Sequence, residues 1–318
     1  EFRRVLFRSQ ALDELESLGV FVAPRSSCVS LAQNRIAEKN FLATWKSETN
    51  IGPAPNFVIE HDADIAHVPK DLFPGILKTA RMGYDGKGQI TVHTSEQLTE
   101  AWAELGKVPC VLEKRMELDF EVSALVVRGY DDSVVAYPVS QNVHRDGILH
   151  TSTVPAPSLK PAQEKKIIDA AKALIRKINY VGVLCVEFFV LKNGDIVANE
   201  IAPRPHNSGH YTMDACVSSQ FEQQVRAMAR LPLGDTRQLA PVSMLNLLGD
   251  LWFNGNEDQA KEPAWNKVLA HPDAKLHLYG KSAPRMGRKM GHINCLGEAL
   301  NEARQNCAAV ATELGIEP

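Results

Sequence analysis

The chain has 318 residues, of which 44% are hydrophobic and 23% are charged, and its formal net charge at pH 7 is −3. This composition is typical of a folded protein of two or three packed units, and it lacks the basic excess that would indicate a nucleic-acid partner. No apolar run approaches the ~18 residues that a membrane-spanning helix requires, and no signal peptide is visible. The six cysteines are scattered without C-x-x-C spacing, which favours free thiols in the cytoplasm over a zinc site or disulfide framework.

The first residues, 1–9, read EFRRVLFRS, and VLFRS resembles the translation of the end of a sequencing adapter. We therefore exclude them from the fold reasoning, with a native basic arm as the alternative interpretation. From Ala11 the pattern predicts a helix that stops at Gly19 and a short strand over 20–23. This αβ unit is expected to be the last piece of a larger α/β domain whose beginning is absent from the chain.

A second helix is expected from Ser26 or Ser27 to about Trp45, because serine is a favoured helix-capping residue. Arg35 and Lys39 lie four residues apart on it. Such a pair usually forms a solvated face, and we expect the same here.

A glycine-rich loop, GYDGKGQ at 83–89, lies between expected strands at 75–80 and 89–93. Its three glycines let the backbone approach a ligand closely, and Lys78 and Lys87 add positive charge. The motif is neither a Walker A loop nor G-x-G-x-x-G. Two interpretations stay open: a flap over phosphates, or a structural hairpin rich in glycine.

The middle of the chain alternates short strands with helices. Helices are expected at 95–105 and 163–178, and strands at 57–59, 110–114, 120–127 and 134–139. The segment 140–157 is expected to be polar and rich in turns. Its His144 either contacts a ligand or caps a turn, and the capping interpretation is favoured.

Two strands, 181–191 and 195–202, are expected around the Asn-Gly pair at 193–194, because Asn-Gly favours the type I′ turn of a two-residue hairpin loop. Counting outward from this loop places Glu187 opposite Glu200. Directly opposed side chains have Cβ atoms about 4.5–5.5 Å apart, so two carboxylates there repel unless something bridges them. Mg²⁺ with phosphate co-ligands is the favoured bridge. The alternatives are a protonated acid or separate basic partners.

Polar residues concentrate where the hairpin ends, in PRPHNSGH at 203–210. Its prolines restrict the backbone, so we expect a rigid loop that binds an anion and orders a substrate. A helix at 218–231 and a strand at 242–248 follow.

The last part of the chain is expected to be a small unit with short strands near 275–279 and 292–295 and a helix at 296–314. Between them lies a cationic loop, KSAPRMGRKMGH at 281–292. Its charges form either a solvated face or a phosphate site, since arginine forks and backbone NH groups suit phosphate.

Together, GYDGKGQ, NEIAPRPHNSGH and KSAPRMGRKMGH resemble the ATP-grasp family of 5-(carboxyamino)imidazole ribonucleotide synthetases of purine biosynthesis. The resemblance runs from about Ala11 to the C-terminus. It implies an α/β (α+β) fold with two ATP-grasp subdomains. The implied parts are a remnant of an N-terminal open α/β (pre-ATP-grasp) domain with a linker helix, subdomain A, subdomain B and a small β-rich C-terminal domain, at 10–50, 51–116, 117–250 and 251–318.

The resemblance also implies roles for single residues. The residues implied to bind ATP are Arg35, Lys78, Gly83, Tyr84, Asp85, Gly86, Lys87, Gly88, Gln89, Glu113, Lys114, Arg115, Met116, Glu121, His144, Asn199 and Glu200. Glu187 and Glu200 would hold Mg²⁺. The implied catalytic residues are Arg204, His206 and Lys281, and Lys281 with Arg288 would hold the substrate phosphate.

The implied function is ligation of bicarbonate to 5-aminoimidazole ribonucleotide through carboxyphosphate, with ATP and Mg²⁺ as cofactors and a homodimer as the assembly. Loss of most of the N-terminal domain would make this form weakly active. The alternatives are another ATP-grasp ligase, such as a formate-dependent glycinamide ribonucleotide transformylase or a biotin carboxylase relative, or a nucleotide-binding fragment without turnover.

Overall fold

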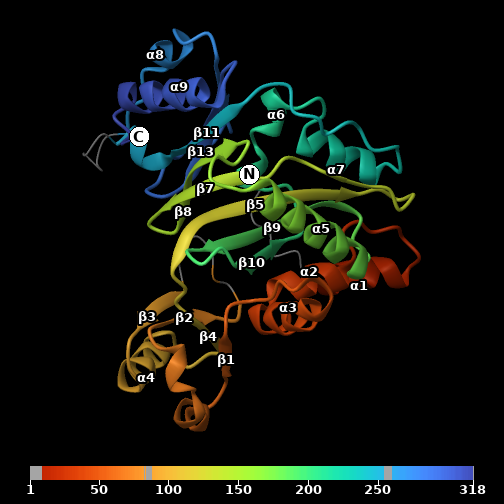
Figure 1. The fold of residues 1–318 in the computed structure, drawn as a ribbon, viewed down its shortest axis with the longest axis vertical. Coiled ribbons are helices and arrows are strands. Elements are labelled where there is room, and N and C mark those ends of the chain that lie inside the picture. The colour runs from red at the N-terminus through yellow and green to blue at the C-terminus, as the bar shows by residue number, and fades with distance from the viewer. Residues whose placement is uncertain (1–8, 82, 84–87, 254–259, 318) are drawn as a thin grey trace.

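The computed structural model describes residues 9–81, 83, 88–253 and 260–317 (Figure 1). The adapter-like residues 1–8 and the loop residues Tyr84, Asp85, Gly86 and Lys87 therefore lie outside the described residues. The chain begins with three helices, α1 (Ser9–Ser17), α2 (Ser26–Gln33) and α3 (Arg35–Thr49). Among the described residues, no helix is long and apolar enough to cross a membrane.

A small four-stranded antiparallel sheet follows, and Figure 1 shows it at the bottom with one helix packed against it. Its spatial order is β1-β4-β2-β3. The elements of this part are β1 (Asn56–Ile59), η1 (Asp62–His67), η2 (Lys70–Leu72), β2 (Gly75–Thr79), β3 (Gln89–Val92), α4 (Ser95–Glu104) and β4 (Cys110–Lys114). Leu98 and Trp102 of α4 pack against Leu77 and Leu112 of the sheet, which gives this part its own core.

The remaining strands, β5 to β13, form a second sheet of nine strands. Its order is β10-β9-β5-β7-β8-β11-β13-β12, with β6 paired to β5. The strands are β5 (Leu118–Arg128), β6 (Val134–Ala136), β7 (Ser140–Arg145), β8 (Ile148–Val154), β9 (Gly182–Leu191), β10 (Ile196–Ala202), β11 (Val242–Leu248), β12 (Ala274–Leu278) and β13 (Lys289–Leu296). The helices of this part are α5 (Pro161–Lys177), η3 (Asn207–Gly209), α6 (Thr212–Ala215), α7 (Gln220–Met228), η4 (Gly249–Trp252), α8 (Trp265–Leu269) and α9 (Leu300–Glu313).

Strand β5 shows how the large sheet divides into a core face and a site face. Successive side chains of a strand point to opposite faces. Val122, Ala124 and Val126 lie in the core that α5 covers. Glu121 and Ser123 alternate with them, and Ser123 is paired with Glu187 of β9. The acidic side chains of β5 and β9 therefore share the face opposite α5.

The C-terminal strands continue the large sheet, since β11 pairs with both β8 and β13. The helix α9 covers these strands, and Val310 and Cys307 pack against Leu245 and Ile293. The two expected strands and the C-terminal helix are therefore present, with the strands joined to the large sheet. The predicted domain boundaries themselves stay predictions.

Four local expectations were wrong, and the first two lie near the start of the chain. Residues 20–23 form no strand, because they pair with none of the described strands and so lack the partner that a strand needs. The helix expected over 26–45 is two helices, because Asn34 is extended with φ −125° and ψ 106°. Its side-chain oxygen accepts hydrogen bonds from the backbone N–H groups of Ile36 and Ala37, at 3.0 and 3.4 Å. Asn34 thus begins α3, as a good N-cap residue does.

The segment 140–157 contains two paired strands, β7 and β8, where we expected turns. The connection is Asp146-Gly147, and both residues have positive φ, 49° and 74°. This is the backbone of a type I′ hairpin turn, for which Asp-Gly is a favoured sequence. The polar side chains in this segment concealed the hairpin because they belong to a buried polar layer, in which the Asn142 side chain donates to Ser123 Oγ at 2.6 Å.

The turn between β9 and β10 also differs from the expected type I′ turn. Gly194 has φ 87°, whereas Asn193 is not among the positive-φ residues. The backbone N–H of Leu191 bonds to the carbonyl of Asp195 at 2.9 Å, so the loop has one residue more than expected. A three-residue loop with a left-handed glycine is the next commonest hairpin connection.

Candidate active site

Glu187 and Glu200 are paired across β9 and β10, as expected. Glu187 is only 17% exposed at its side chain. Burial and the neighbouring Glu200 carboxylate raise the pKa of Glu187 to about 7, and His144 opposes this effect. Two acids held together at this depth favour a bound cation, because each charge raises the energy of the other.

Glu121 and His144 lie on the same face of the sheet as this acidic pair. His144 Nδ1 is 3.0 Å from Glu121 Oε2. Burial lowers the pKa of His144, but the Glu121 carboxylate more than offsets this, so the pKa is raised overall. His144 lies within strand β7, against Glu121, and the favoured interpretation of His144 as a turn cap is therefore wrong.

A cluster of three cations surrounds one carboxylate where α3 meets the small sheet. Glu113 lies 3.5 Å from Arg35 Nη1, 3.2 Å from Lys39 Nζ and 3.1 Å from Lys78 Nζ. Burial would raise the pKa of Glu113, yet the three cations lower it to about 2. Glu113 can balance only one of the three cations, and Glu38 and Glu200 are the further acids near Arg35. Three cations gathered in this way suit a phosphate.

The expectation that Arg35 and Lys39 form a solvated face is wrong. The Lys39 side chain is 1% exposed and that of Arg35 is 17% exposed. The helix break at Asn34 explains this placement, because the backbone N–H of Arg35 bonds to the carbonyl of Ala80, just after β2, at 2.8 Å. The first turn of α3 is thereby fixed against the small sheet, with its charged side chains turned inward.

The cation cluster is connected to the acidic pair through the backbone of β10. Lys39 Nζ donates to the carbonyl of Asn199 at 2.7 Å, and the backbone N–H of Ile201 donates to Glu38 Oε1 at 2.6 Å. Burial raises the pKa of Glu38 to about 7, and Lys39 opposes this effect. These contacts hold Glu200, between the two bonded residues, beside the cations.

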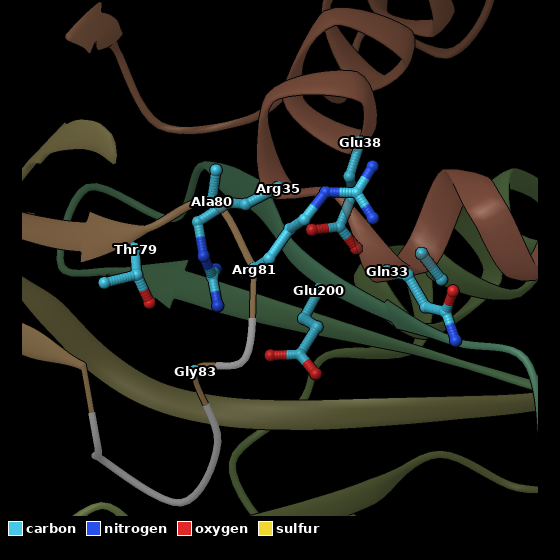
Figure 2. A pocket seen from close by; sticks show the side chains of 9 residues that line it. Gln33, Arg35, Glu38, Thr79, Ala80, Arg81, Gly83 and Glu200 are labelled. Carbon is cyan, nitrogen blue, oxygen red and sulfur yellow. The ribbon is translucent and has the colours of Figure 1, made fainter. Parts of the chain in front are cut away.

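Figure 2 shows the pocket that results. Arg35 and Glu38 reach it from α3, and Glu200 reaches it from β10. The remaining lining residues are Ala32, Gln33, Thr79, Ala80, Arg81 and Gly83. The Asn199 side-chain oxygen is buried and has no hydrogen-bond partner among the described residues. An orphaned acceptor beside two carboxylates is suited to a ligand that brings a cation or a donor.

The loop after β10 places His206 against Glu187. His206 Nε2 lies 3.3 Å from Glu187 Oε1. The other ring nitrogen, Nδ1, accepts a hydrogen bond from the backbone N–H of Ser208 at 3.4 Å. A neutral His206 therefore carries its proton on Nε2, facing the carboxylate. Arg204, two residues earlier, donates to the carbonyl of Pro205 at 3.0 Å and opposes the raised pKa of Glu187.

The cationic loop of the C-terminal part is held by its own backbone carbonyls. Lys281 Nζ donates to the carbonyl of Lys289 at 2.5 Å, and Arg288 Nη1 donates to that of Ala283 at 2.5 Å. Asp250 accepts from the backbone N–H of Gly287 at 2.6 Å. These bonds order the segment in which Lys281 and Arg288 were predicted to bind a phosphate.

The residues at 113–116, which the resemblance implies to bind ATP, lie at the junction of the two sheets. Lys114 is the last residue of β4, and its backbone N–H donates to the carbonyl of Pro55 at 2.8 Å. The backbone N–H of Arg115 donates to the carbonyl of Pro74 at 2.9 Å. Met116 follows just before β5. The Glu113 carboxylate forms ion pairs with the three cations, so it positions the groups that are predicted to bind phosphate.

Comparison with protein families decides the assignment of the chain. The model of the ATP-grasp domain matches residues 47–221, and that of the phosphoribosylaminoimidazole carboxylase C-terminal domain matches residues 242–306. The N5-carboxyaminoimidazole ribonucleotide synthase of Brucella melitensis is 43% identical over 287 residues, which are 89% of this chain and 75% of the relative. The chain belongs to the N5-carboxyaminoimidazole ribonucleotide synthase family.

Solved structures of the synthase family share the fold. A crystal structure of the synthetase from Thermus thermophilus superposes with a TM-score of 0.86 at 34% identity, covering 100% of this chain and 81% of that one. A structure of the synthase from Aspergillus clavatus in complex with ADP and 5-aminoimidazole ribonucleotide has a TM-score of 0.85 at 29% identity, covering 96% and 79%. The expected ATP-grasp fold is confirmed.

Two residues of this synthase-family site were missed in the sequence, Glu38 and Lys39. Both are nearly fully buried, at 2% and 1% exposure. The available signal was Asn34, a strong N-cap residue directly before Arg35, which shifts the helix start and with it the face that turns inward.

Proposed function

We propose that the protein catalyses the ATP-dependent carboxylation of 5-aminoimidazole ribonucleotide by bicarbonate, with N5-carboxyaminoimidazole ribonucleotide, ADP and phosphate as products. The family assignment supports this reaction. The observation that carries it is the buried cluster of three cations around Glu113, next to the opposed acids Glu187 and Glu200. Such a site balances only when it receives an anion and a cation together, as magnesium-bound ATP provides.

Mg²⁺ fits the acidic side of the site. Glu187 and Glu200 supply hard oxygen ligands, and the orphaned side-chain oxygen of Asn199 lies on the same strand. The described residues contain no group of three or more His, Cys, Asp or Glu side chains able to hold a metal by themselves. This agrees with an ion that takes further oxygen ligands from phosphate. When bound, Mg²⁺ would neutralise charge on the transferring phosphoryl group.

The cation cluster would orient the triphosphate. Arg35 and Lys78 are held by Glu113 at 3.5 and 3.1 Å, so their charged groups are already in place before the nucleotide arrives. Preorganised donors lower the barrier because they need no rearrangement as charge develops. A bicarbonate oxygen attacks the γ-phosphorus, the bond to the bridging oxygen of ADP breaks, and carboxyphosphate forms.

His206 and Arg204 would bind the bicarbonate. The Nε2–H of His206 and the guanidinium of Arg204 are donors close to Glu187. The exocyclic amine of the ribonucleotide then bonds to the carboxyl carbon, and the carbon–oxygen bond to phosphate breaks. The released phosphate accepts the amine proton. Lys281 and Arg288 would hold the 5′-phosphate of the ribonucleotide, on which the position of the amine depends.

The test is a steady-state assay of ADP release with single substrates omitted. We expect release that requires both bicarbonate and 5-aminoimidazole ribonucleotide, together with the carboxylated product. Turnover with formate in place of bicarbonate would support the transformylase alternative instead. Binding of magnesium-bound ATP in a calorimeter without any turnover would support a nucleotide-binding fragment. A homodimer and a cytoplasmic location stay predictions, the first of which light scattering tests.

A further inference from the structure

We infer that Gln220 and His210 are positioning residues that fix His206 relative to Lys281, across the junction between the loop after β10 and the C-terminal strands. The inference rests on the proposed function, which gives His206 and Lys281 their roles. Neither Gln220 nor His210 is needed to touch a reacting atom. They fix the distance between His206 and Lys281, two groups that must act on one substrate.

Gln220, at the start of α7, is fully buried. Its side-chain oxygen accepts from the backbone N–H of His206 at 2.8 Å, and its nitrogen donates to the His206 carbonyl at 2.7 Å. The same nitrogen lies 3.0 Å from His210 Nδ1. An amide nitrogen has two hydrogens, so one goes to His206 and the other to His210. This arrangement requires a neutral His210 with its proton on Nε2.

His210 begins a stack of rings that leaves the loop and enters the C-terminal strands. The His210 and His292 rings stack with centroids 4.7 Å apart, and His277 stacks on His292 at 4.6 Å. His277 Nε2 lies 2.8 Å from Asp214 Oδ2, and the Asn294 side chain donates to the same oxygen at 2.6 Å. The stack is therefore anchored at its far end by α6 and β13.

A branch of contacts through Tyr279 joins the stack to Lys281. The hydroxyl of Tyr279 is 2.9 Å from His292 Nδ1, and the Tyr279 ring also meets the edge of His210 at 6.0 Å. Lys281 Nζ lies 5.5 Å from the centre of the Tyr279 ring, within the range of a cation–π contact. Contacts thus run without interruption from the His206 backbone to the Lys281 ammonium.

The two central rings of this connection, His210 and His292, have lowered pKa values. Burial, helped by the nearby charges of Lys289 and Arg204 and by His277, lowers the pKa of His210 to about 3. Burial, with His210 and His277, lowers the pKa of His292 to about 2. A neutral ring keeps one donor and one acceptor in fixed places. The connection therefore stays unchanged over the neutral pH range.

Gln220→Met tests the inference, because it keeps the length of the side chain and removes the three polar contacts. We expect KM for 5-aminoimidazole ribonucleotide to rise, kcat/KM for it to fall by about 10²-fold, and ADP release to exceed carboxylated product. KM for ATP should stay unchanged, since the cation cluster is untouched. A positional error raises the KM of one substrate selectively, whereas loss of folded protein lowers kcat alone.

Gln223→Met is the matched control. Gln223 lies on the same helix, is equally buried, and makes two hydrogen bonds, to Gly234 N and O at 2.9 and 2.7 Å. It should cost similar stability and leave the ratio of ADP to product at that of the native protein. Equal effects of the two substitutions on KM would overturn the inference.

A second measurement applies even where Gln220→Met does not fold. Nitrogen chemical shifts of the native protein report which ring nitrogen of His210 carries the proton. We expect Nε2 protonated, and a proton on Nδ1 would overturn the inference. His210→Phe keeps the ring stack and removes the acceptor. It should therefore show the same excess of ADP release over carboxylated product as Gln220→Met, but a smaller one. Absence of carboxylation by the native protein would refute the proposed function, while the Nε2 tautomer would still support the structural connection.

Discussion

Glu187 and Glu200 face each other across β9 and β10 because two irregularities of the hairpin compensate for one another. The loop at Gly194 has three residues, which shifts the pairing near the turn, so that Ile196 lies opposite Val190. A bulge between Ala198 and Glu200 then restores the pairing of the two acids. Bulges often re-aim side chains next to active sites. Here the bulged residue is Asn199. Its carbonyl accepts a hydrogen bond from Lys39, and its side-chain oxygen has no hydrogen-bond partner in the described part of the chain.

Glu200→Gln is expected to lower kcat by about 10²–10³-fold, because it removes a charge needed as the phosphoryl group transfers. The fold should remain intact. Since Glu200 raises the pKa of Glu187 by repulsion, thermal unfolding of the variant should occur at an equal or higher temperature. Asp195→Asn, at an exposed position of the same hairpin, is the control. An unchanged kcat at saturating Mg²⁺ would reject Glu200 as a metal ligand.

Lys39→Met should lower the free energy of unfolding by about 1–3 kcal/mol, because the Asn199 carbonyl and Glu113 each lose a buried partner. Affinity for ATP should fall as well, since the cluster loses one cation. The exposed Lys46 on the same helix gives the control, Lys46→Met. Denaturant titration and calorimetric binding check the two effects. Equal stability of the two variants would show that Lys39 has no structural role.

Glu113 should make the protein sensitive to acid. Its pKa is lowered to about 2 in the folded protein, against about 4.3 in an unfolded chain. The stabilisation is therefore complete above the unfolded pKa and is lost as pH falls through the folded pKa, and it amounts to roughly 3 kcal/mol. Denaturant titrations of native protein and Glu113→Gln between pH 6 and pH 2 measure it. The variant should be less stable at pH 6 and lose less stability on acidification. Parallel pH profiles of the two proteins would contradict this assignment.

Much of the site was predictable because local chemistry determined it. The pairing of Glu187 and Glu200 was predicted correctly, although by counting from a two-residue loop that does not exist. The prediction contained one residue too few in the turn and did not include the bulge. These two errors cancelled, since each moves the register by one residue. Sequence patterns determine which faces of two strands meet more reliably than they determine the irregularities between them.

The buried charges were not predictable from local patterns. Lys39 and Glu38 meet their partners only after α3, β4 and β10 come together. The i,i+4 spacing of Arg35 and Lys39 on a helix is equally typical of a solvated face. Gln220 illustrates the same limit, because its partners His206 and His210 lie in a separate loop. The hairpin at Asp146-Gly147 is different, since its turn signal was present in the sequence and was outweighed by the polar side chains around it.

In the proposed mechanism, bicarbonate attacks the γ-phosphorus of ATP directly, in the site formed by the cation cluster and the acidic pair. The most direct measurement supplies bicarbonate labelled with the heavy isotope of oxygen and follows the label by mass spectrometry of the phosphate released during carboxylation of 5-aminoimidazole ribonucleotide. Transfer through carboxyphosphate leaves one bicarbonate oxygen in each phosphate, because the oxygen–phosphorus bond that forms is never broken. We expect this label in the phosphate. Carboxylated product accompanied by unlabelled phosphate would contradict it.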